Sequence, residues 1–124
     1  MKITRFEEIE AWKAARVLAN EVYEATASHA LRADLSLQRQ MRSCATSVMA
    51  NIAEGFDAGS HAEFSRFLRI SRRSATELQS HFYVALDRLY VPREEFERLY
   101  EHANEAKKLI GGFLRYLKSP KLRT

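Results

Sequence analysis

Hydrophobic residues recur along this chain at intervals of three and four, the spacing that places side chains on one face of an α-helix. The pattern predicts four helices, over about 5–28, 35–55, 61–90 and 92–118. It is clearest in the third helix, whose apolar face comprises Phe64, Phe67, Leu68, Ser71, Ala75, Leu78, Phe82, Ala85, Leu86 and Leu89. In the fourth helix the steps of three and four alternate, which is close to a heptad repeat.

Capping signals mark the helix boundaries. Thr4-x-x-Glu7 and Ser60-x-x-Glu63 match the capping box, in which the hydroxyl and the glutamate each accept a backbone N–H. Either Asp34 or Ser36 is a suitable N-cap for the second helix, and Gly55 fits its end.

Short connections between these helices favour antiparallel neighbours, because a short link leaves no room for a crossover. The predicted fold is therefore all-α, an antiparallel up-down-up-down four-helix bundle that forms a single domain over residues 1–124. The composition agrees, since 46% of the residues are hydrophobic and 29% charged, with only 4 Gly and 2 Pro.

The cellular compartment is predicted from three features. The single cysteine, Cys44, cannot form an intrachain disulfide, and the N-terminal segment has acidic residues where a signal peptide needs an apolar core. No run approaches the ~20 apolar residues that span a bilayer. We expect a cytoplasmic protein without a membrane partner.

The sequence contains no recognisable catalytic or metal-binding motif. Glu-x-x-His, the pair that builds di-metal sites in helical bundles, does not occur, and the four histidines are scattered. There is no glycine-rich phosphate loop or nucleophile elbow, and Cys44 is interpreted as a small helix-packing residue. The sequence predicts no catalytic residue, no metal and no cofactor, and hence no enzyme.

Polar residues form a second stripe on the predicted second helix, beside its apolar face: Gln40, Ser43, Ser47, Asn51 and Glu54. The third helix carries a comparable strip: Ile70, Ser74, Glu77 and His81. We expect the two strips to meet, within one chain or between subunits. Asn51 and Glu54 then have two interpretations, as contacts that fix a subunit interface or as a hydrogen-bonded helix end terminated by Gly55.

Net charge is +4, and the positive excess lies late in the chain. Residues 59–91 contain five basic and three acidic residues, and residues 92–124 contain eight basic and five acidic ones. Such a surface could contact phosphates. The alternative is a solvated face partly neutralised by Glu77 and Asp87. The nucleic-acid-binding candidates are Arg66, Arg69, Arg72, Arg73, Lys107, Lys108, Arg115 and Lys118.

Four motifs carry a resemblance that extends over about residues 5–118. They are Phe6-x-x-Ile9-x-x-Trp12, Ser47-Val48-x-x-Asn51-Ile52-Ala53-Glu54-Gly55, Glu63-Phe64-x-x-Phe67-Leu68-x-Ile70 and Ser74-x-x-Glu77-Leu78. In these the chain resembles the bacterial four-helix-bundle proteins first noticed in open reading frames of 23S rRNA intervening sequences.

The resemblance implies a homo-oligomer, a homopentamer, without enzymatic activity and associated with RNA or an RNA-handling protein. It also implies that the contacts of the oligomer or of the shared motif involve Asn51, Glu54, Gly55, Ser74 and Glu77. The alternative from another class is a small-ligand-binding protein or enzyme. That function would use a polar pocket at the seam between the second and third helices, lined by Asn51, Glu54, Glu77 and His81.

Overall fold

The computed structural model describes residues 2–119, which form helices and connecting turns without strands. Four helices are long: α1 (Glu10–Thr26), α3 (Leu35–Phe56), α4 (His61–Asp87) and α5 (Arg93–Leu117). Two are short: the 3-10 helix η1 (Phe6–Glu8) and α2 (His29–Ala33). The predicted all-α class is confirmed. No helix among the described residues is long and apolar enough to cross a membrane.

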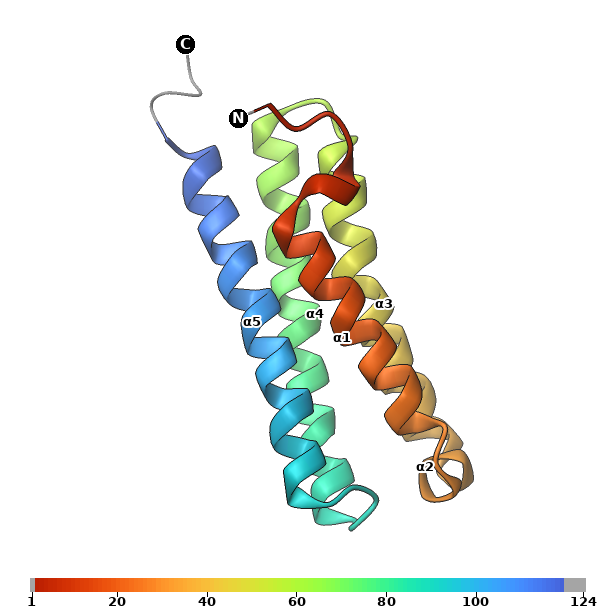
Figure 1. The fold of residues 1–124 in the computed structure, drawn as a ribbon. Helices are drawn as coiled ribbons and strands as arrows, with labels where there is room; N and C mark the ends of the chain where they lie inside the picture. The colour runs from red at the N-terminus through yellow and green to blue at the C-terminus, as the bar shows by residue number, and fades with distance from the viewer. Residues whose placement is uncertain (1, 120–124) are drawn as a thin grey trace.

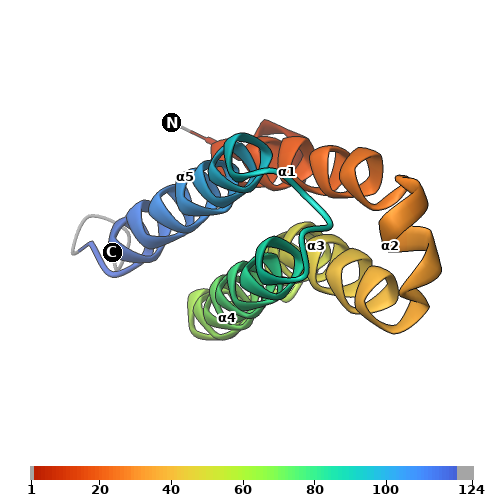
Figure 2. The same ribbon diagram turned by 90° about the horizontal axis from the view of Figure 1, so that it is seen from below.

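The long helices lie side by side, and Figure 1 shows the chain reversing its direction from each to the next. The contacts follow a closed order in which α1 packs on α3 and α5, and α4 packs on α3 and α5. The view from below shows that the α1 and α3 pair is inclined to the α4 and α5 pair (Figure 2). The α3–α4 contact is the most extensive.

The core forms where the predicted apolar faces meet. Side chains without solvent exposure come from all four long helices, and they include Leu18, Val22, Val48, Ile52, Leu68, Leu78, Leu99 and Ile110. Because every long helix contributes a continuous buried stripe, hydrophobic burial is the main force that holds the helices together.

The first helix begins later than predicted. The chain forms the short η1 turn, then an extended residue at Ile9 (φ −76°, ψ 122°), and only then α1. The proposed Thr4-x-x-Glu7 capping box is wrong, because the Thr4 N–H donates to Glu8 (2.9 Å) while Glu7 pairs with Arg5. The extended backbone places Ile9 in the core, and this burial outweighs a continuous helix.

The segment His29–Ala33, which lies between the first two predicted helices, is the short helix α2. The Ser28 Oγ caps it by accepting the Leu31 N–H (3.3 Å), and the Leu31 side chain is completely buried. Asp34 rather than Ser36 then caps α3, since its Oδ1 accepts the Leu37 N–H (3.2 Å).

The third predicted helix, over 61–90, ends at Asp87 instead. The Leu89 N–H donates to the Leu86 carbonyl and the Tyr90 N–H to the Ala85 carbonyl, which is the Schellman arrangement. Leu89 occupies the left-handed position (φ 63°) that glycine usually fills, and its side chain is 87% exposed. Pro92 follows and disfavours helical geometry at the residue before it, so α5 starts afresh at Arg93.

Candidate functional site

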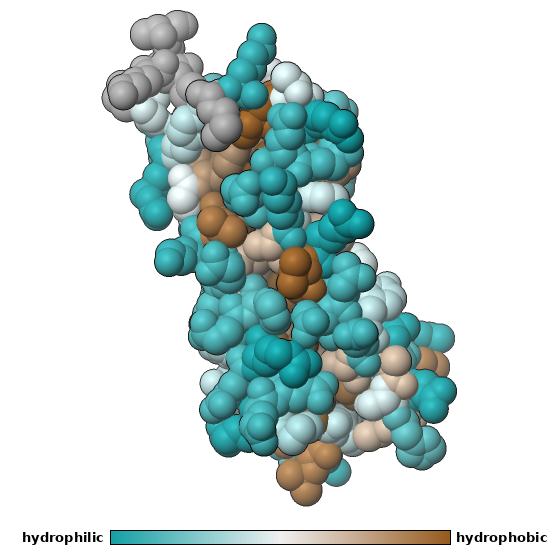
Figure 3. Space-filling view, in the orientation of Figure 1, coloured by the Kyte–Doolittle hydropathy of each residue, from teal (hydrophilic) through white to brown (hydrophobic). Residues whose placement is uncertain are grey.

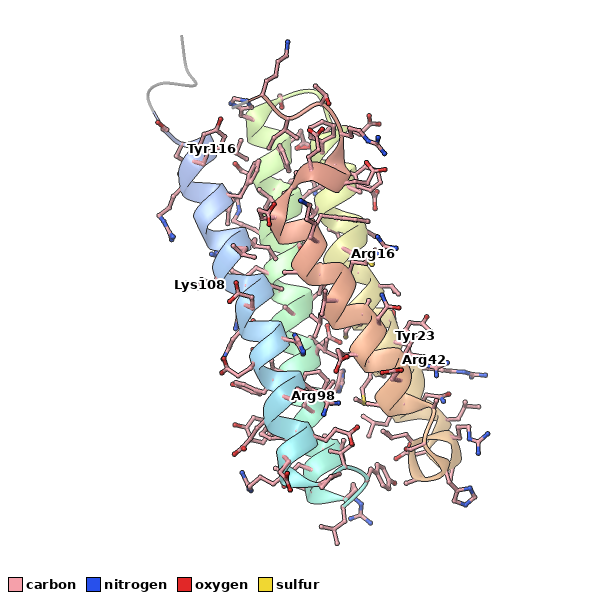
Figure 4. All side chains as sticks on the ribbon, viewed as in Figure 1. Arg16, Tyr23, Arg42, Arg98, Lys108 and Tyr116 are labelled. Atoms are coloured by element: carbon pink, nitrogen blue, oxygen red, sulfur yellow. The ribbon has the colours of Figure 1, made fainter. Side chains whose placement is uncertain are left out.

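Basic side chains from two helices converge beside Gly111 on α5. A Cβ built at Gly111 would lie 3.7 Å from an Arg115 guanidinium nitrogen and 4.0 Å from one of Arg72, so both nitrogens approach a single point. Lys108 projects from the same helix at the edge of the molecule (Figure 4). We call Arg72, Lys107, Lys108 and Arg115 the α4–α5 basic surface.

A buried glutamine joins this surface to the helix contact beneath it. The Gln79 side chain on α4 is only 4% exposed. Its Nε2 donates to the Asn104 Oδ1 (2.8 Å), and its Oε1 accepts from the Lys107 Nζ (3.0 Å). The Lys107 ammonium is thus held on the protein surface by a fixed neutral partner, and its charge is left uncompensated.

Among the described residues, no carboxylate forms an ion pair with any member of the α4–α5 basic surface. Arg42 also lacks an ion pair within the described part of the chain, but its guanidinium is occupied by contacts within the protein. Its Nε donates to the Thr26 Oγ1 (2.8 Å) and its guanidinium covers the Tyr23 ring at 4.5 Å, so it serves the contact between α1 and α3 (Figure 4). Uncompensated guanidinium groups are the ones available to an external anion.

The predicted arginines of α4 do not form one surface. Arg66 pairs with Glu63 (3.0 Å) and lies over the Phe67 ring at 4.6 Å. Arg69 and Arg73 are exposed on α4, but of the four arginines only Arg72 comes within 4.0 Å of a Cβ placed at Gly111. Lys118 is exposed just after α5, and the basic residues beyond it lie outside the described part of the chain. Only Arg72 joins the α5 cluster.

The polar strips of α3 and α4 meet within one chain. The Ser47 and Ser74 hydroxyls are hydrogen-bonded (2.9 Å), and the Asn51 amide donates to the carbonyl (2.8 Å) and Oγ (2.9 Å) of Ser47. Below them the fully buried Ser71 hydroxyl donates to the Val48 carbonyl (2.6 Å). Small hydroxyl side chains therefore let the two helices approach closely along this seam.

Gly55 is a packing position rather than a helix terminator. A Cβ at Gly55 would lie 2.8 Å from both the Phe64 Cδ1 and the Phe67 Cβ, closer than real Cβ atoms come. Helix α3 continues through Phe56, and the left-handed glycine of the following turn is Gly59 (φ 90°). The interpretation of Gly55 as the end of the helix is therefore wrong. Glu54 beside it is exposed and has no ion pair among the described residues.

A cluster of three potential metal ligands lies further along the same seam. Cys44 from α3 meets Glu77 and His81 from α4, with one donor atom of each within 4.8 Å of the others. The His81 Nε2 lies 3.4 Å from a Glu77 carboxylate oxygen, yet it makes no hydrogen bond. Burial raises the pKa of the Cys44 thiol to about 12, and the neighbouring Glu77 carboxylate adds to the shift.

Grooves occur elsewhere on the molecule. One of about 490 Å³ lies between α1 and α5, and its lining combines apolar residues such as Ile9, Leu109 and Phe113 with the charged residues Glu8, Glu10, Lys108 and Arg115. Apolar residues accordingly follow the α1–α5 seam, between the hydrophilic residues on either side of it (Figure 3). Neither this groove nor that of about 420 Å³ beside Gly55 is lined by Asn51, Glu54, Glu77 or His81.

The family model of the 23S rRNA-intervening sequence proteins matches residues 7–112, which is most of the chain. The chain belongs to the 23S rRNA-intervening sequence protein family. A similar solved structure is that of a protein of unknown function from the S23 ribosomal protein family of Bacteroides thetaiotaomicron. It shares 22% sequence identity with a TM-score of 0.77, and the match covers 84% of this chain and 97% of that one. No curated protein matches the chain.

In this member of the 23S rRNA-intervening sequence protein family, sequence reasoning placed Glu77 and His81 in one polar strip but missed Cys44 as their neighbour and missed the three as potential metal ligands. The di-metal motif Glu-x-x-His has an i,i+3 spacing, whereas Glu77 and His81 are related by i,i+4. Both spacings place two side chains on one helix face. A search with both spacings could have found the α4 pair, but only the structure brings Cys44 to it.

Proposed function

We propose that this protein is a non-enzymatic, self-associating up-down-up-down four-helix bundle that binds RNA through its α4–α5 basic surface. The observation that carries the proposal is the convergence of Arg72 and Arg115 beside Gly111 without a neutralising carboxylate among the described residues. Bringing two guanidinium groups together is unfavourable in the free protein, and a polyanion relieves that repulsion.

RNA is the polyanion that we favour. Arg72 and Arg115 can each take a phosphate in a bidentate manner, while the ammonium groups of Lys107 and Lys108 add charge nearby. The link of the family to 23S rRNA intervening sequences supports this choice. Because these contacts would go to the phosphate backbone, we expect recognition of RNA shape rather than of base sequence.

Self-association would multiply this surface. Helix α3 exposes Gln40, Ser43, Thr46, Ala50 and Glu54, a face of mostly small residues suited to close contact with another subunit. The α3 side chains that form hydrogen bonds at the α3–α4 seam are Ser47 and Asn51, which lie beside this exposed face. In a homopentamer the basic surface would occur five times, so that one RNA engages several weak patches at once.

The RNA-binding proposal is tested by the double substitution Arg72→Gln with Arg115→Gln. We expect weaker binding of a labelled RNA hairpin at low salt, and a log–log salt slope reduced by about 1.4–1.8 for each subunit that the hairpin contacts, because two phosphate contacts are lost in that subunit. Fluorescence anisotropy at several salt concentrations measures both quantities.

The matched control for this experiment is Arg66→Gln with Arg69→Gln, which removes the same charge from two other exposed positions of α4. We expect the control to leave the slope within about 0.5 of the unsubstituted value. Equal slopes for the two double variants would show that binding depends on total charge alone, and would contradict a specific surface.

The oligomer is tested separately by light scattering at micromolar concentration. We expect a mass five times the 14.3 kDa of one chain. Replacing Ala50 with Glu on the exposed face of α3 is expected to reduce that mass, because a charge would enter the subunit contact. A stable 14.3 kDa species in the unsubstituted protein would remove the oligomer from the proposal.

A further inference from the structure

Three donor atoms of different chemistry gather at the α3–α4 seam, outside the basic surface. They are the Cys44 Sγ, a Glu77 carboxylate oxygen and a His81 ring nitrogen, all within 4.8 Å of one another. Donors around a tetrahedral zinc ion lie about 3.3–3.8 Å apart, given bond lengths near 2.0 Å to N and O and 2.3 Å to S. The His81 and Glu77 atoms are already 3.4 Å apart, so only small side-chain rotations are needed.

The state of the His81 Nε2 is independent evidence that this cluster has a donor atom without a partner in the part of the chain that the structure describes. The atom is inaccessible to solvent and has no hydrogen bond within the described residues. A buried polar nitrogen in this state costs free energy, and native proteins usually pair such atoms. Helices α3 and α4 therefore hold the His81 ring nitrogen near the Glu77 carboxylate and the Cys44 thiol, although this nitrogen forms no hydrogen bond within the described residues.

We propose that Cys44, Glu77 and His81 form a binding site for a zinc-type divalent metal ion. The thiol and imidazole are ligands of zinc and related transition metals, whereas Mg²⁺ and Ca²⁺ prefer oxygen ligands alone. Glu77 is 58% exposed at the outer side of the cluster, so solvent can reach the metal from there. Three protein ligands and one water complete a tetrahedron.

Coordination of a metal ion would change the protonation state of Cys44. The Cys44 thiol gives its proton to solvent, its sulfur binds the metal as thiolate, and the neutral His81 ring donates a nitrogen lone pair. The ion would then tie α3 to α4 through Cys44 on one side and His81 on the other. This site is independent of the RNA-binding proposal, because none of its ligands belongs to the α4–α5 basic surface.

The test is a titration of the purified, untagged chain with Co²⁺, which reports thiolate ligation through a sulfur-to-cobalt charge-transfer band. We expect saturation at one Co²⁺ per chain, and loss of the band when Zn²⁺ displaces the cobalt. Cys44→Ser is expected to abolish the band. His81→Gln is expected to weaken Co²⁺ binding at least about tenfold, as loss of a supporting group already does in metal sites.

The matched control is His102→Gln, which removes a half-buried histidine from α5 and leaves the cluster intact. Its titration should coincide with that of the unsubstituted chain. Circular dichroism establishes that each variant is folded, and if Cys44→Ser is not, His81→Gln decides the question. The absence of a charge-transfer band in the unsubstituted chain, or an equal affinity in His81→Gln, would overturn the proposal.

Discussion

Replacing Leu31 with alanine is expected to lower the free energy of unfolding by about 2–5 kcal/mol, the range for leucines in well-packed cores. Leu31 is completely buried although it lies in the five-residue helix α2. Alanine leaves the Ser28 cap unchanged, because that bond uses the Leu31 backbone N–H. The loss would therefore measure packing alone. Urea unfolding followed by far-UV circular dichroism provides the value.

Leu35→Ala is the control for this substitution. It makes the same change of side chain four residues further on, at a position that is 47% exposed. We expect a change within about 0.5 kcal/mol, as for most surface positions. Both variants should be compared at one protein concentration, since self-association contributes to apparent stability. Similar losses of unfolding free energy in the two variants would show that Leu31 does not anchor the segment between α1 and α3 to the core.

Gly55→Ala is expected to have the second-largest effect, a net loss of about 1–2 kcal/mol. Overpacking costs about 1–3 kcal/mol, and the greater helical preference of alanine returns up to about 1 kcal/mol of that. The new methyl group would meet the Phe67 Cβ at 2.8 Å. That atom is attached directly to the α4 backbone, so relief requires the helices to move apart rather than a side chain to rotate. Thermal unfolding in parallel with urea unfolding measures the change.

Gly111→Ala makes the same substitution at a helical position that has space for the added methyl group. A Cβ at that position finds its nearest neighbours at 3.7 and 4.0 Å, both on flexible arginine side chains. We expect this variant to be more stable by about 1 kcal/mol, because only the helical preference changes. Opposite signs for the two glycines would establish that α3 and α4 need a glycine at their crossing. Equal signs would contradict that explanation.

The spacing of residues along the sequence predicts which side chains share a helix face, but not which side chains of another helix they meet. Helical spacing makes Arg66, Arg69, Arg72 and Arg73 neighbours on one helix, but of these only Arg72 comes within 4.0 Å of a Cβ placed at Gly111 on α5. The partner of Arg72 is Arg115 from α5, and no spacing rule relates them. The α4 half of the metal cluster is visible as an i,i+4 pair, whereas its Cys44 ligand depends on how α3 and α4 are paired.

The all-α class, the buried stripes of the long helices and the cap at Ser60 followed from the sequence by itself, because helix periodicity and capping act between residues within one or two turns. Tertiary structure alone decided the break at Ile9, the anchoring of α2 by Leu31 and the role of Gly55. At each of these positions a contact with a distant part of the chain outweighs the local preference. Burial in the core is worth more than a continued turn of helix, and steric exclusion at a helix crossing depends on the helix opposite.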